Sequence, residues 1–334
     1  MKKVIKNNGK GTYVLTCDLG SKVKLLKHIG LKTPESNDSF FKGFQSELAR
    51  LIGVALPNAE VITMSMEDLA DDILTEALRK QSLLQDAVVV SSCAEIAIPR
   101  KGHIIEINRI VDERGKIIGL GPRPGFPSLD EQLESIRVFT VDRPIIIVED
   151  GSFTGGTMCH VIRKFKDKGI KIAAVVIGFA FPKALAAIQR EYSGEIIVIE
   201  KLNELLDWMP DHDFFPFTPN CGRVFDLSIS GQNYPFYTHN NASYSVPYII
   251  PFGNMREWSS IPDTSTGPIS LFCLQQALAL FERIEKLSGK EIKIGDILGT
   301  RPKISIPISI GQNVFPRLDT RITSFLSETC HELT

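Results

Sequence analysis

The 334-residue sequence has almost no net charge, no long apolar run and no closely spaced cysteine pair. Its 38 lysines and arginines against 39 acidic residues give a formal net charge of −1. It therefore lacks the basic excess of proteins that bind nucleic acid nonspecifically. No segment approaches the roughly 18 apolar residues that a membrane helix requires. Asn, Gly and Lys residues come soon after Met1-Lys2-Lys3, where a secretory signal would have its apolar stretch. We expect a cytoplasmic protein with no membrane partner.

The six cysteines are scattered along the chain and form no C-x-x-C pair. In a chain of this length they predict reduced, mostly buried thiols rather than a disulfide framework or a zinc site. Internal repeats and low-complexity segments are also lacking. The content of 43% hydrophobic and 23% charged residues is ordinary for a globular protein with a sizeable core.

Strand and helix patterns alternate clearly between residues 144 and 200. Three apolar segments are predicted strands: 145–148, 171–179 and 195–199. Two helices would separate them, the first ending at Gly169 and the second beginning at Pro182. This alternation at short spacing is typical of a parallel sheet with helices on its faces. We therefore predict an α/β fold.

Helix signals also occur outside this region. Ser65 with Asp68 predicts a capped helix to about Leu84, followed by a short buried strand at 86–90. Ser128 with Glu131 predicts another capped helix, and Asp112 to Gly115 predicts a turn. Two more helices are expected at 40–52 and 269–287. The sequence thus divides into an N-terminal extension (1–64), an α/β core (65–209) and a partly irregular C-terminal region (210–334).

The segment that carries chemistry follows the predicted strand at 145–148. Two adjacent carboxylates, Glu149 and Asp150, come first, and each can accept hydrogen bonds from neighbouring sugar hydroxyls. The next seven residues form a small-residue loop that leads into a helix: Gly151, Ser152, Phe153, Thr154, Gly155, Gly156 and Thr157. Loop amides and the free N–H groups of a helix N-terminus bind phosphate. A P-loop would need a lysine after Gly156, where Thr157 stands. The pattern indicates a sugar-phosphate site.

The strand, the acidic pair and the loop ending in Thr154-Gly155-Gly156-Thr157 resemble the phosphoribosyl pyrophosphate (PRPP) motif of type I phosphoribosyltransferases. The chain would be an atypical, long member of that family, whose smaller members have about 200 residues. The resemblance implies the family's parallel sheet flanked by helices, with N-terminal and C-terminal additions. It also implies that Glu149 and Asp150 hold the ribose hydroxyls while the loop binds the 5′-phosphate. Mg²⁺ would be held mainly through the ligand, with no metal site made by the protein alone.

Two further parts of the site are predicted from the resemblance. The family's pyrophosphate loop falls at Ser91-Ser92-Cys93, and Arg100 could also contact pyrophosphate. Arg123 is the best arginine candidate for the catalytic site, because Gly121-Pro122-Arg123-Pro124-Gly125 is a stiff and unusual setting. Lys101, Arg109 and Arg114 are weaker candidates. The family's base-binding hood could lie within 205–263.

Several other residues have both a functional and a structural interpretation. Asp211-His212-Asp213 could bind a metal or supply a base, but we favour a hydrogen-bonded turn. His160 is expected to be a packing or surface histidine. Six aromatic residues could stack on a base, but we favour a core role: Phe214, Phe215, Phe217, Tyr234, Phe236 and Tyr237.

The predicted function is Mg²⁺-dependent exchange of pyrophosphate for a nitrogenous base on ribose 5-phosphate, in either direction. The partners would be PRPP and a small base or nucleotide, with a homo-oligomer expected. Two alternatives remain open. One is a PRPP- or nucleotide-binding regulatory protein that has lost turnover. The other is an effector or accessory component of a bacterial stress or defence system.

Overall fold

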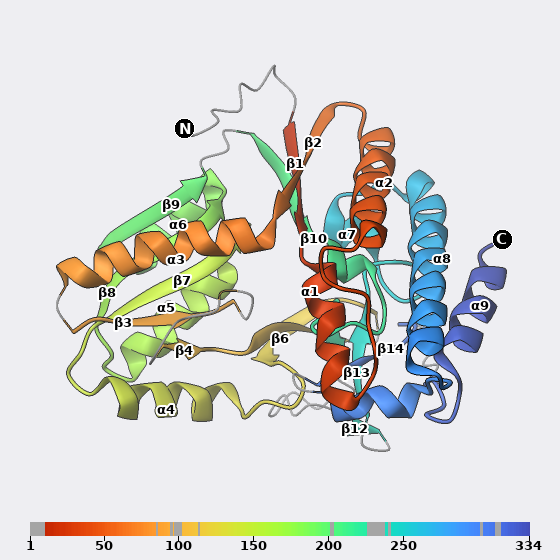
Figure 1. The fold of residues 1–334 in the computed structure, drawn as a ribbon. Coiled ribbons are helices and arrows are strands. Elements are labelled where there is room, and N and C mark those ends of the chain that lie inside the picture. Colours follow the sequence, from red (N-terminus) through yellow and green to blue (C-terminus); the bar gives the residue numbers. More distant parts are fainter. Residues whose placement is uncertain are drawn as a thin grey trace. The chain divides into compact units, whose positions relative to one another are not determined.

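The chain forms two compact units in the computed structural model (Figure 1). The described residues are 11–84, 86–93, 96, 102–112, 114–200, 204–225, 238–239, 242–300, 303–310 and 315–334. Unit 1 comprises Met1–Thr12, Met64–Ile107 and Phe126–Leu205. Unit 2 comprises Tyr13–Thr63, Asn108–Gly125 and Leu206–Thr334. The predicted boundaries at 64/65 and 209/210 stay a prediction.

Unit 1 is built on a five-stranded sheet in the order β4-β3-β7-β8-β9, and each neighbouring pair is parallel. Its strands are β3 (Val88–Ser91), β4 (His103–Ile104), β7 (Ile145–Ser152), β8 (Ile172–Ala180) and β9 (Glu195–Glu200). Its helices are α3 (Met66–Leu83), α4 (Leu129–Thr140), α5 (Gly156–Asp167) and α6 (Pro182–Glu191). Helix α3 crosses one face of the sheet, and α5 and α6 lie together on the other (Figure 1). The predicted α/β fold, a parallel sheet flanked by helices, is confirmed.

Local sequence signals account for these elements. Every side chain from Ile145 to Val148 is fully buried, as expected of a strand covered on both faces. Ser65 Oγ accepts the Asp68 N–H at the start of α3, and Ser128 with Glu131 forms a complete capping box on α4. Gly169 ends α5 with a φ of 71°, the left-handed conformation that glycine adopts readily.

The strand before the acidic pair is longer than predicted. The sequence indicated an end at Val148, but β7 continues to Ser152 because β8 runs alongside it. Gly151 pairs with Phe179, and Ser152 pairs with Ala180. Residues 149–152 are polar or small and show no apolar pattern, so the sequence of β7 alone does not reveal its end. The pairing with β8 defines it. Both carboxylates therefore stand on a strand rather than in a loop.

Unit 2 contains two sheets and a large apolar core. One sheet has the order β10-β1-β2, and the other β12-β13-β11-β5-β6, with β14 also paired to β13. The strands of the first are β1 (Gly11–Cys17), β2 (Ala59–Ser65) and β10 (Leu205–Pro210). Those of the second are β5 (Ile107–Val111), β6 (Ile117–Pro122), β11 (Arg223–Phe225), β12 (Thr238–His239), β13 (Ala242–Val246) and β14 (Ile306–Pro307). The predicted turn between β5 and β6 is confirmed, since the Gly115 N–H donates to Asp112 O at 2.9 Å.

The helices of unit 2 pack around that core. They are α1 (Leu19–Lys24), η1 (Leu25–Ile29), α2 (Ser39–Ala55), η2 (Asp211–Phe214), α7 (Met255–Ser259), α8 (Asp263–Ser288), η3 (Ile294–Gly299) and α9 (Ile322–Glu332). The predicted helices at 40–52 and 269–287 are confirmed as α2 and α8. Helix α8 begins six residues earlier than predicted and contains Pro268. Leu274, Phe281 and Ile284 are fully buried on its inner face.

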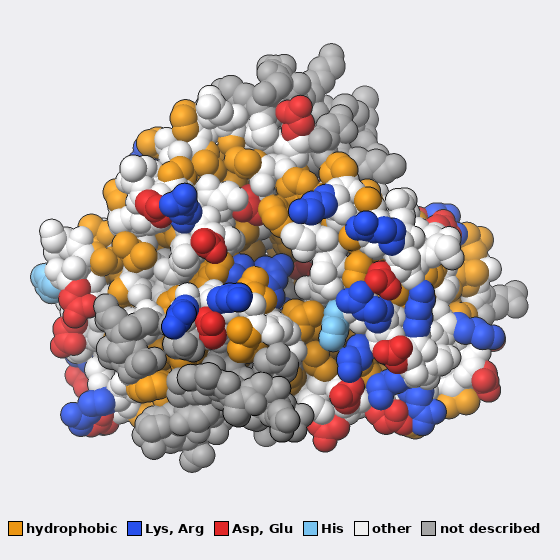
Figure 2. Space-filling model, turned by 180° about the vertical axis from the view of Figure 1, so that it is seen from behind, with side chains coloured by type: hydrophobic (Ala, Val, Ile, Leu, Met, Phe, Trp, Pro, Cys, Tyr) orange, Lys and Arg blue, Asp and Glu red, His pale blue; other side chains and the backbone are white. Residues whose placement is uncertain are grey.

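The charged surface and the state of the cysteines agree with what the composition predicts. Acidic and basic side chains are interspersed over the face that Figure 2 shows. Among the helices in the described ranges, none is both long and apolar enough to cross a membrane. All six cysteines are free thiols, and Cys93, Cys159, Cys221 and Cys273 are buried, so the prediction of reduced, mostly buried thiols is confirmed.

Candidate functional site

The ends of β3 and β7 bring two predicted groups of residues together in unit 1. The two strands are parallel neighbours, and Ser91 pairs with Val148 in their register. The next residues along each strand are Ser92 and Glu149. Because carboxyl ends of parallel strands meet at one edge of a sheet, where open α/β folds bind ligands, this edge is the candidate site.

Side chains of the β3 end contact both carboxylates. Ser92 Oγ donates to Glu149 Oε2, and Cys93 Sγ donates to Asp150 Oδ2 at 3.0 Å. Ser92 is 4% exposed and Cys93 is 2% exposed, whereas Glu149 and Asp150 are half-buried. Buried donors thus face carboxylates that are still within reach of a ligand.

Ser91 fixes the turn that follows β3. Its Oγ donates to Cys93 O at 2.7 Å and accepts the Cys93 N–H at 3.1 Å. These two contacts close the turn on itself, so its backbone shape does not depend on the side chains of the next two residues. Contact between residues 91–93 and pyrophosphate stays a prediction.

The predicted phosphate loop leads directly into α5. The Gly151 N–H donates to Asp150 Oδ1 at 2.7 Å, and the Gly156 N–H donates to Thr154 Oγ1 at 3.4 Å. The Cys159 N–H donates to Gly155 O at 2.8 Å and opens the bonding pattern of the helix. The N–H groups before it have no partner within the helix, as at every helix N-terminus, and they favour an anion. Phosphate binding by residues 151–157 stays a prediction.

Gly155 has a structural reason to be glycine. Its φ is 82°, and an added Cβ would lie 3.0 Å from Ala184 O and 3.1 Å from the Ala187 Cβ on α6. The loop must therefore pass close to α6 before α5 begins. Phe153 in the same loop is 41% exposed and stacks edge-on against Phe181, with ring centroids 4.7 Å apart.

Gly178 belongs to the surroundings of the site, and the sequence analysis missed it. A Cβ at this position in β8 would lie 2.3 Å from the backbone oxygen of Asp150. Only glycine lets β8 approach the acidic pair this closely. A lone glycine inside an apolar strand was the available signal.

The arginine candidates are not all described. Arg100 and Lys101 lie outside the described residues. Arg123 follows β6 in unit 2 and is half-buried, and Arg109 and Arg114 also belong to unit 2. The catalytic role of Arg123 stays a prediction.

His160 lies on α5 and is half-buried. Burial lowers the pKa of its imidazole, and the charges of Lys164 and Arg163 lower it further. The ring is therefore neutral near pH 7. This agrees with the expected packing or surface role.

Asp211, His212 and Asp213 form the buried 3₁₀ helix η2 in unit 2. Asp211 Oδ1 accepts the N–H groups of Asp18 and Leu19, both at 3.0 Å, and its Oδ2 accepts from Gln45 Nε2 at 2.8 Å. The favoured interpretation, a local hydrogen-bonded turn, is confirmed by the Phe215 N–H, which donates to His212 O at 3.0 Å, whereas the Asp211 side chain bonds residues far away in the sequence.

Two residues of η2 also form an acidic cluster with the start of α1. His212 Nδ1 lies 2.6 Å from Asp18 Oδ1. Ligand atoms of Asp18, Asp211 and His212 all lie within 4.8 Å of one another, a spacing that could hold a metal ion. The contacts that Asp211 makes with backbone N–H groups give this cluster a structural role whether or not a metal binds.

Three of the aromatic residues that could have stacked on a base lie in the unit 2 core. Phe214, Phe215 and Phe217 are fully buried, and Phe215 packs edge-on against Phe44 with centroids 5.2 Å apart. Their core role is confirmed. Tyr234, Phe236 and Tyr237 lie outside the described residues.

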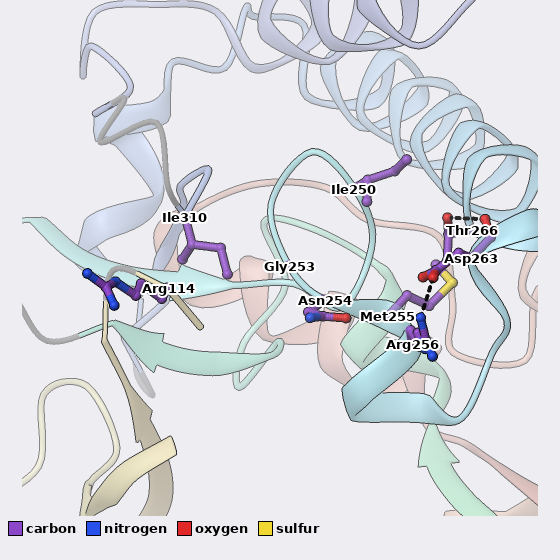
Figure 3. A pocket seen from close by; sticks show the side chains of 9 residues that line it. All are labelled: Arg114, Ile250, Gly253, Asn254, Met255, Arg256, Asp263, Thr266 and Ile310. Atoms are coloured by element: carbon purple, nitrogen blue, oxygen red, sulfur yellow. Dashed lines mark hydrogen bonds and ion pairs between the residues drawn. The ribbon is translucent and has the colours of Figure 1, made fainter. Parts of the chain in front are cut away.

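A pocket of about 330 Å³ lies in unit 2 (Figure 3). It is lined by Arg114, Ile250, Gly253, Asn254, Met255, Arg256, Asp263, Thr266 and Ile310. Arg256 donates to Asp263 Oδ2 at 2.7 Å, and Thr266 Oγ1 donates to Asp263 O at 2.9 Å. Asn254 Oδ1 accepts the Glu257 N–H. Arg256, Thr266 and Asn254 thus already have partners within the protein, so the pocket indicates no particular ligand.

Comparisons with known proteins give only distant likenesses. No family model matches the chain, and no curated protein matches it. Among solved structures, one adenine phosphoribosyltransferase is 10% identical, with 40% of this chain and 79% of that chain covered. The adenine phosphoribosyltransferase of Saccharomyces cerevisiae is 12% identical, with 40% and 78% covered. The protein TT1426 of Thermus thermophilus is 14% identical, with 42% and 87% covered. All three have a TM-score of 0.27, too low to support an inference about activity, which depends on the residues of the site.

Proposed function

We propose that unit 1 binds PRPP and catalyses Mg²⁺-dependent exchange of pyrophosphate for a nitrogenous base at C1′ of ribose 5-phosphate. The observation that carries this proposal is the acidic pair at the end of β7, between the β3 turn and the N-terminus of α5. The two carboxylates and the free N–H groups at the start of α5 lie a few residues apart in the sequence, which suits a ribose diol next to a phosphate.

The ribose would bind at Glu149 and Asp150. Each carboxylate oxygen has two lone pairs, so it can accept from a sugar hydroxyl while it also accepts from the protein. The half-buried state of both residues suits this role, because a partly desolvated carboxylate forms a stronger charge-assisted hydrogen bond.

The 5′-phosphate would bind at residues 151–157. The N-terminus of α5 favours negative charge. The exposed side chain of Thr154 and the half-buried one of Thr157 supply hydroxyl donors. Backbone N–H groups bind phosphate without a lysine, in keeping with the absence of lysine from this loop.

The residues present also fit Mg²⁺. Mg²⁺ dehydrates reluctantly and keeps several waters, so it would be held mainly through PRPP and waters, while Glu149 and Asp150 accept from the ribose hydroxyls. Bound Mg²⁺ would neutralise charge on the departing pyrophosphate. The chain itself would orient the ribose by two carboxylates and one helix N-terminus, which favours the transition state by position and electrostatics. Residues 91–93 and Arg100 would contact pyrophosphate, and Arg123 stays a further candidate.

The test combines binding and turnover. Wild-type protein with Mg²⁺ and PRPP is expected to bind by calorimetry and to release pyrophosphate with at least one purine or pyrimidine base. The matched control is Asp130→Asn, which changes an exposed carboxylate on α4 of the same unit and should leave both unchanged. No PRPP binding and no pyrophosphate release by the wild type would contradict the proposal. Binding without release with any base would favour a regulatory PRPP-binding protein.

A further inference from the structure

The two donors after β3 and the two carboxylates at the end of β7 form matched pairs. Ser92 donates to Glu149, and Cys93 donates to Asp150. The pairing follows from the register, since Ser91 lies opposite Val148 and the two chains continue side by side. Both donors are almost fully buried, so the carboxylate takes the place of water as their hydrogen-bond acceptor.

We propose that Ser92 and Cys93 are positioning residues that hold the Glu149 and Asp150 carboxylates in the orientation that receives the ribose hydroxyls. This inference rests on the proposed function of the acidic pair. A carboxylate side chain exposed to water samples several rotamers, and binding then has to restrict it. A donor on the neighbouring strand removes that freedom before the ligand arrives.

The two pairs are not equivalent in strength. A hydroxyl is a stronger donor than a thiol, so Glu149 is held more firmly than Asp150. Asp150 has a second contact, because its Oδ1 accepts the Gly151 N–H at 2.7 Å. A hydrogen bond to the charged form of a carboxyl lowers its pKa, so both donors also favour the ionised state that accepts from a sugar.

Alanine can replace either donor without opening the turn. Ser91 Oγ holds the Cys93 backbone at both its N–H and its oxygen, and neither contact uses the side chain of Ser92 or Cys93. Cys93→Ala therefore removes the hydrogen bond to Asp150. Ser92→Ala removes the one to Glu149 together with the 3.2 Å contact of Ser92 Oγ with Val148 O, while the Ser92 backbone N–H still donates to Val148 O. Cys93→Ser is the conservative variant, because it keeps a donor at the same position.

The first test needs no ligand. The pKa values of the two carboxyls are measured by NMR of side-chain ¹³C in the ligand-free protein, with assignments from Glu149→Gln and Asp150→Asn. Ser92→Ala should raise the pKa of Glu149 by about one unit, the amount that a lost charge-assisted hydrogen bond implies. Cys93→Ala should raise that of Asp150 by less, and Cys93→Ser should not raise it. Unchanged values in both alanine variants would overturn the proposal.

The second test uses PRPP with Mg²⁺. Ser92→Ala should weaken calorimetric binding about tenfold, and the acid limb of the pH–activity profile should move to higher pH, which a purely structural defect would not cause. Cys93→Ser should restore what Cys93→Ala loses. The control Cys273→Ala removes a fully buried thiol on α8 and should leave affinity unchanged.

The two tests separate the positioning role from the proposed function. A wild type that binds PRPP, with alanine variants that bind it equally well, would refute the positioning role. A wild type that binds no PRPP would refute the proposed function instead. In that case the carboxyl pKa values alone decide whether Ser92 and Cys93 hold the acidic pair.

Discussion

At the scale of single residues, the charge of Asp150 is the most direct test of the site. Asp150→Asn keeps an oxygen for the Gly151 N–H, which Asp150 Oδ1 accepts at 2.7 Å, but removes the negative charge that, in the proposed function, accepts from a ribose hydroxyl. Hydrogen bonds to charged groups are worth about 1.5–3 kcal/mol, so PRPP affinity should fall roughly tenfold to a hundredfold. Calorimetry with PRPP and Mg²⁺ measures the affinity, and Glu149→Gln should lower it by a similar factor. Equal affinity of Asp150→Asn and Asp130→Asn would contradict it.

The sequence indicated one part of the candidate site, and the contacts around it could not be predicted for a physical reason. Glu149 and Asp150 follow an apolar strand and precede a small-residue loop, a pattern within one short segment. Their contacts with Ser92 and Cys93 depend on β3 being the neighbour of β7, and no local pattern specifies which strands become neighbours. Gly178 was missed for the same reason, because its requirement comes from Asp150 on the adjacent strand.

At the scale of elements, the two glycines that flank α5 form a natural pair of variants. Gly155 and Gly169 have φ values of 82° and 71°, so alanine at either position costs about 1–2 kcal/mol in backbone strain. The two positions differ in the room available for a side chain. A Cβ at Gly155 would crowd Ala184, whereas nothing lies within 4 Å of one at Gly169.

Gly155→Ala should therefore lower both stability and PRPP affinity, because the start of α5 must move away from α6. Gly169→Ala should lower the thermal midpoint alone. Thermal denaturation and calorimetry on the two variants distinguish the effects. Equal PRPP affinity in both variants would show that the α5 N-terminus does not contact the phosphate.

Element prediction succeeded where the hydrophobic pattern is long or a cap is present. The capped starts at Ser65 and Ser128 and the glycine stop at Gly169 were all visible in the sequence. The start of α8 was missed because Gly267 and Pro268 look like breakers, yet the helix begins before them at Asp263. Short strands such as β11 and β14 have too few residues to show a period, and tertiary pairing alone defines them.

At the scale of the whole molecule, each unit is assembled from separate stretches of chain. Residues 108–125 group with Leu206–Thr334 in unit 2, whereas the stretches on either side of 108–125 belong to unit 1. In unit 2, β11 pairs in parallel with β5, and Val224 lies opposite Ile110. Pairing over such sequence distances is set by the shared apolar core, which local composition does not reveal.

The stability of unit 2 should depend on pH through the cluster of Asp18, Asp211 and His212. Burial and the neighbouring Asp18 carboxylate raise the pKa of Asp211 to about 8. For His212, burial lowers the pKa, but the charge and hydrogen bond of Asp18 outweigh this, so the pKa is raised. Lys22, 3.6 Å from Asp18 Oδ2, and the Asp213 carboxylate, 3.7 Å from His212 Nε2, also face the cluster.

Both shifts have the same sign. A group whose pKa is higher in the folded state keeps its proton while the unfolded chain loses it, so the free energy of unfolding falls as pH rises. For Asp211 the fall begins above its ordinary pKa of 3.8 and levels off above about 8. The pKa of Asp38 is lowered to about 2, chiefly by its hydrogen bond to Arg283. Asp38 therefore stabilises the folded state equally throughout pH 5–8 and does not alter how the free energy of unfolding changes with pH in that range.

The thermal midpoint of unit 2 should therefore be lower at pH 8 than at pH 5. Tryptophan fluorescence reports it, because both tryptophans of the chain, Trp208 and Trp258, belong to unit 2. Asp211→Asn keeps an oxygen for the backbone N–H groups of α1 and removes the titration, so its midpoint should vary less between these pH values. Asp319→Asn, which removes an exposed carboxylate of the same unit, should retain the wild-type dependence. A wild-type midpoint that rises from pH 5 to pH 8 would contradict the raised pKa of the buried cluster.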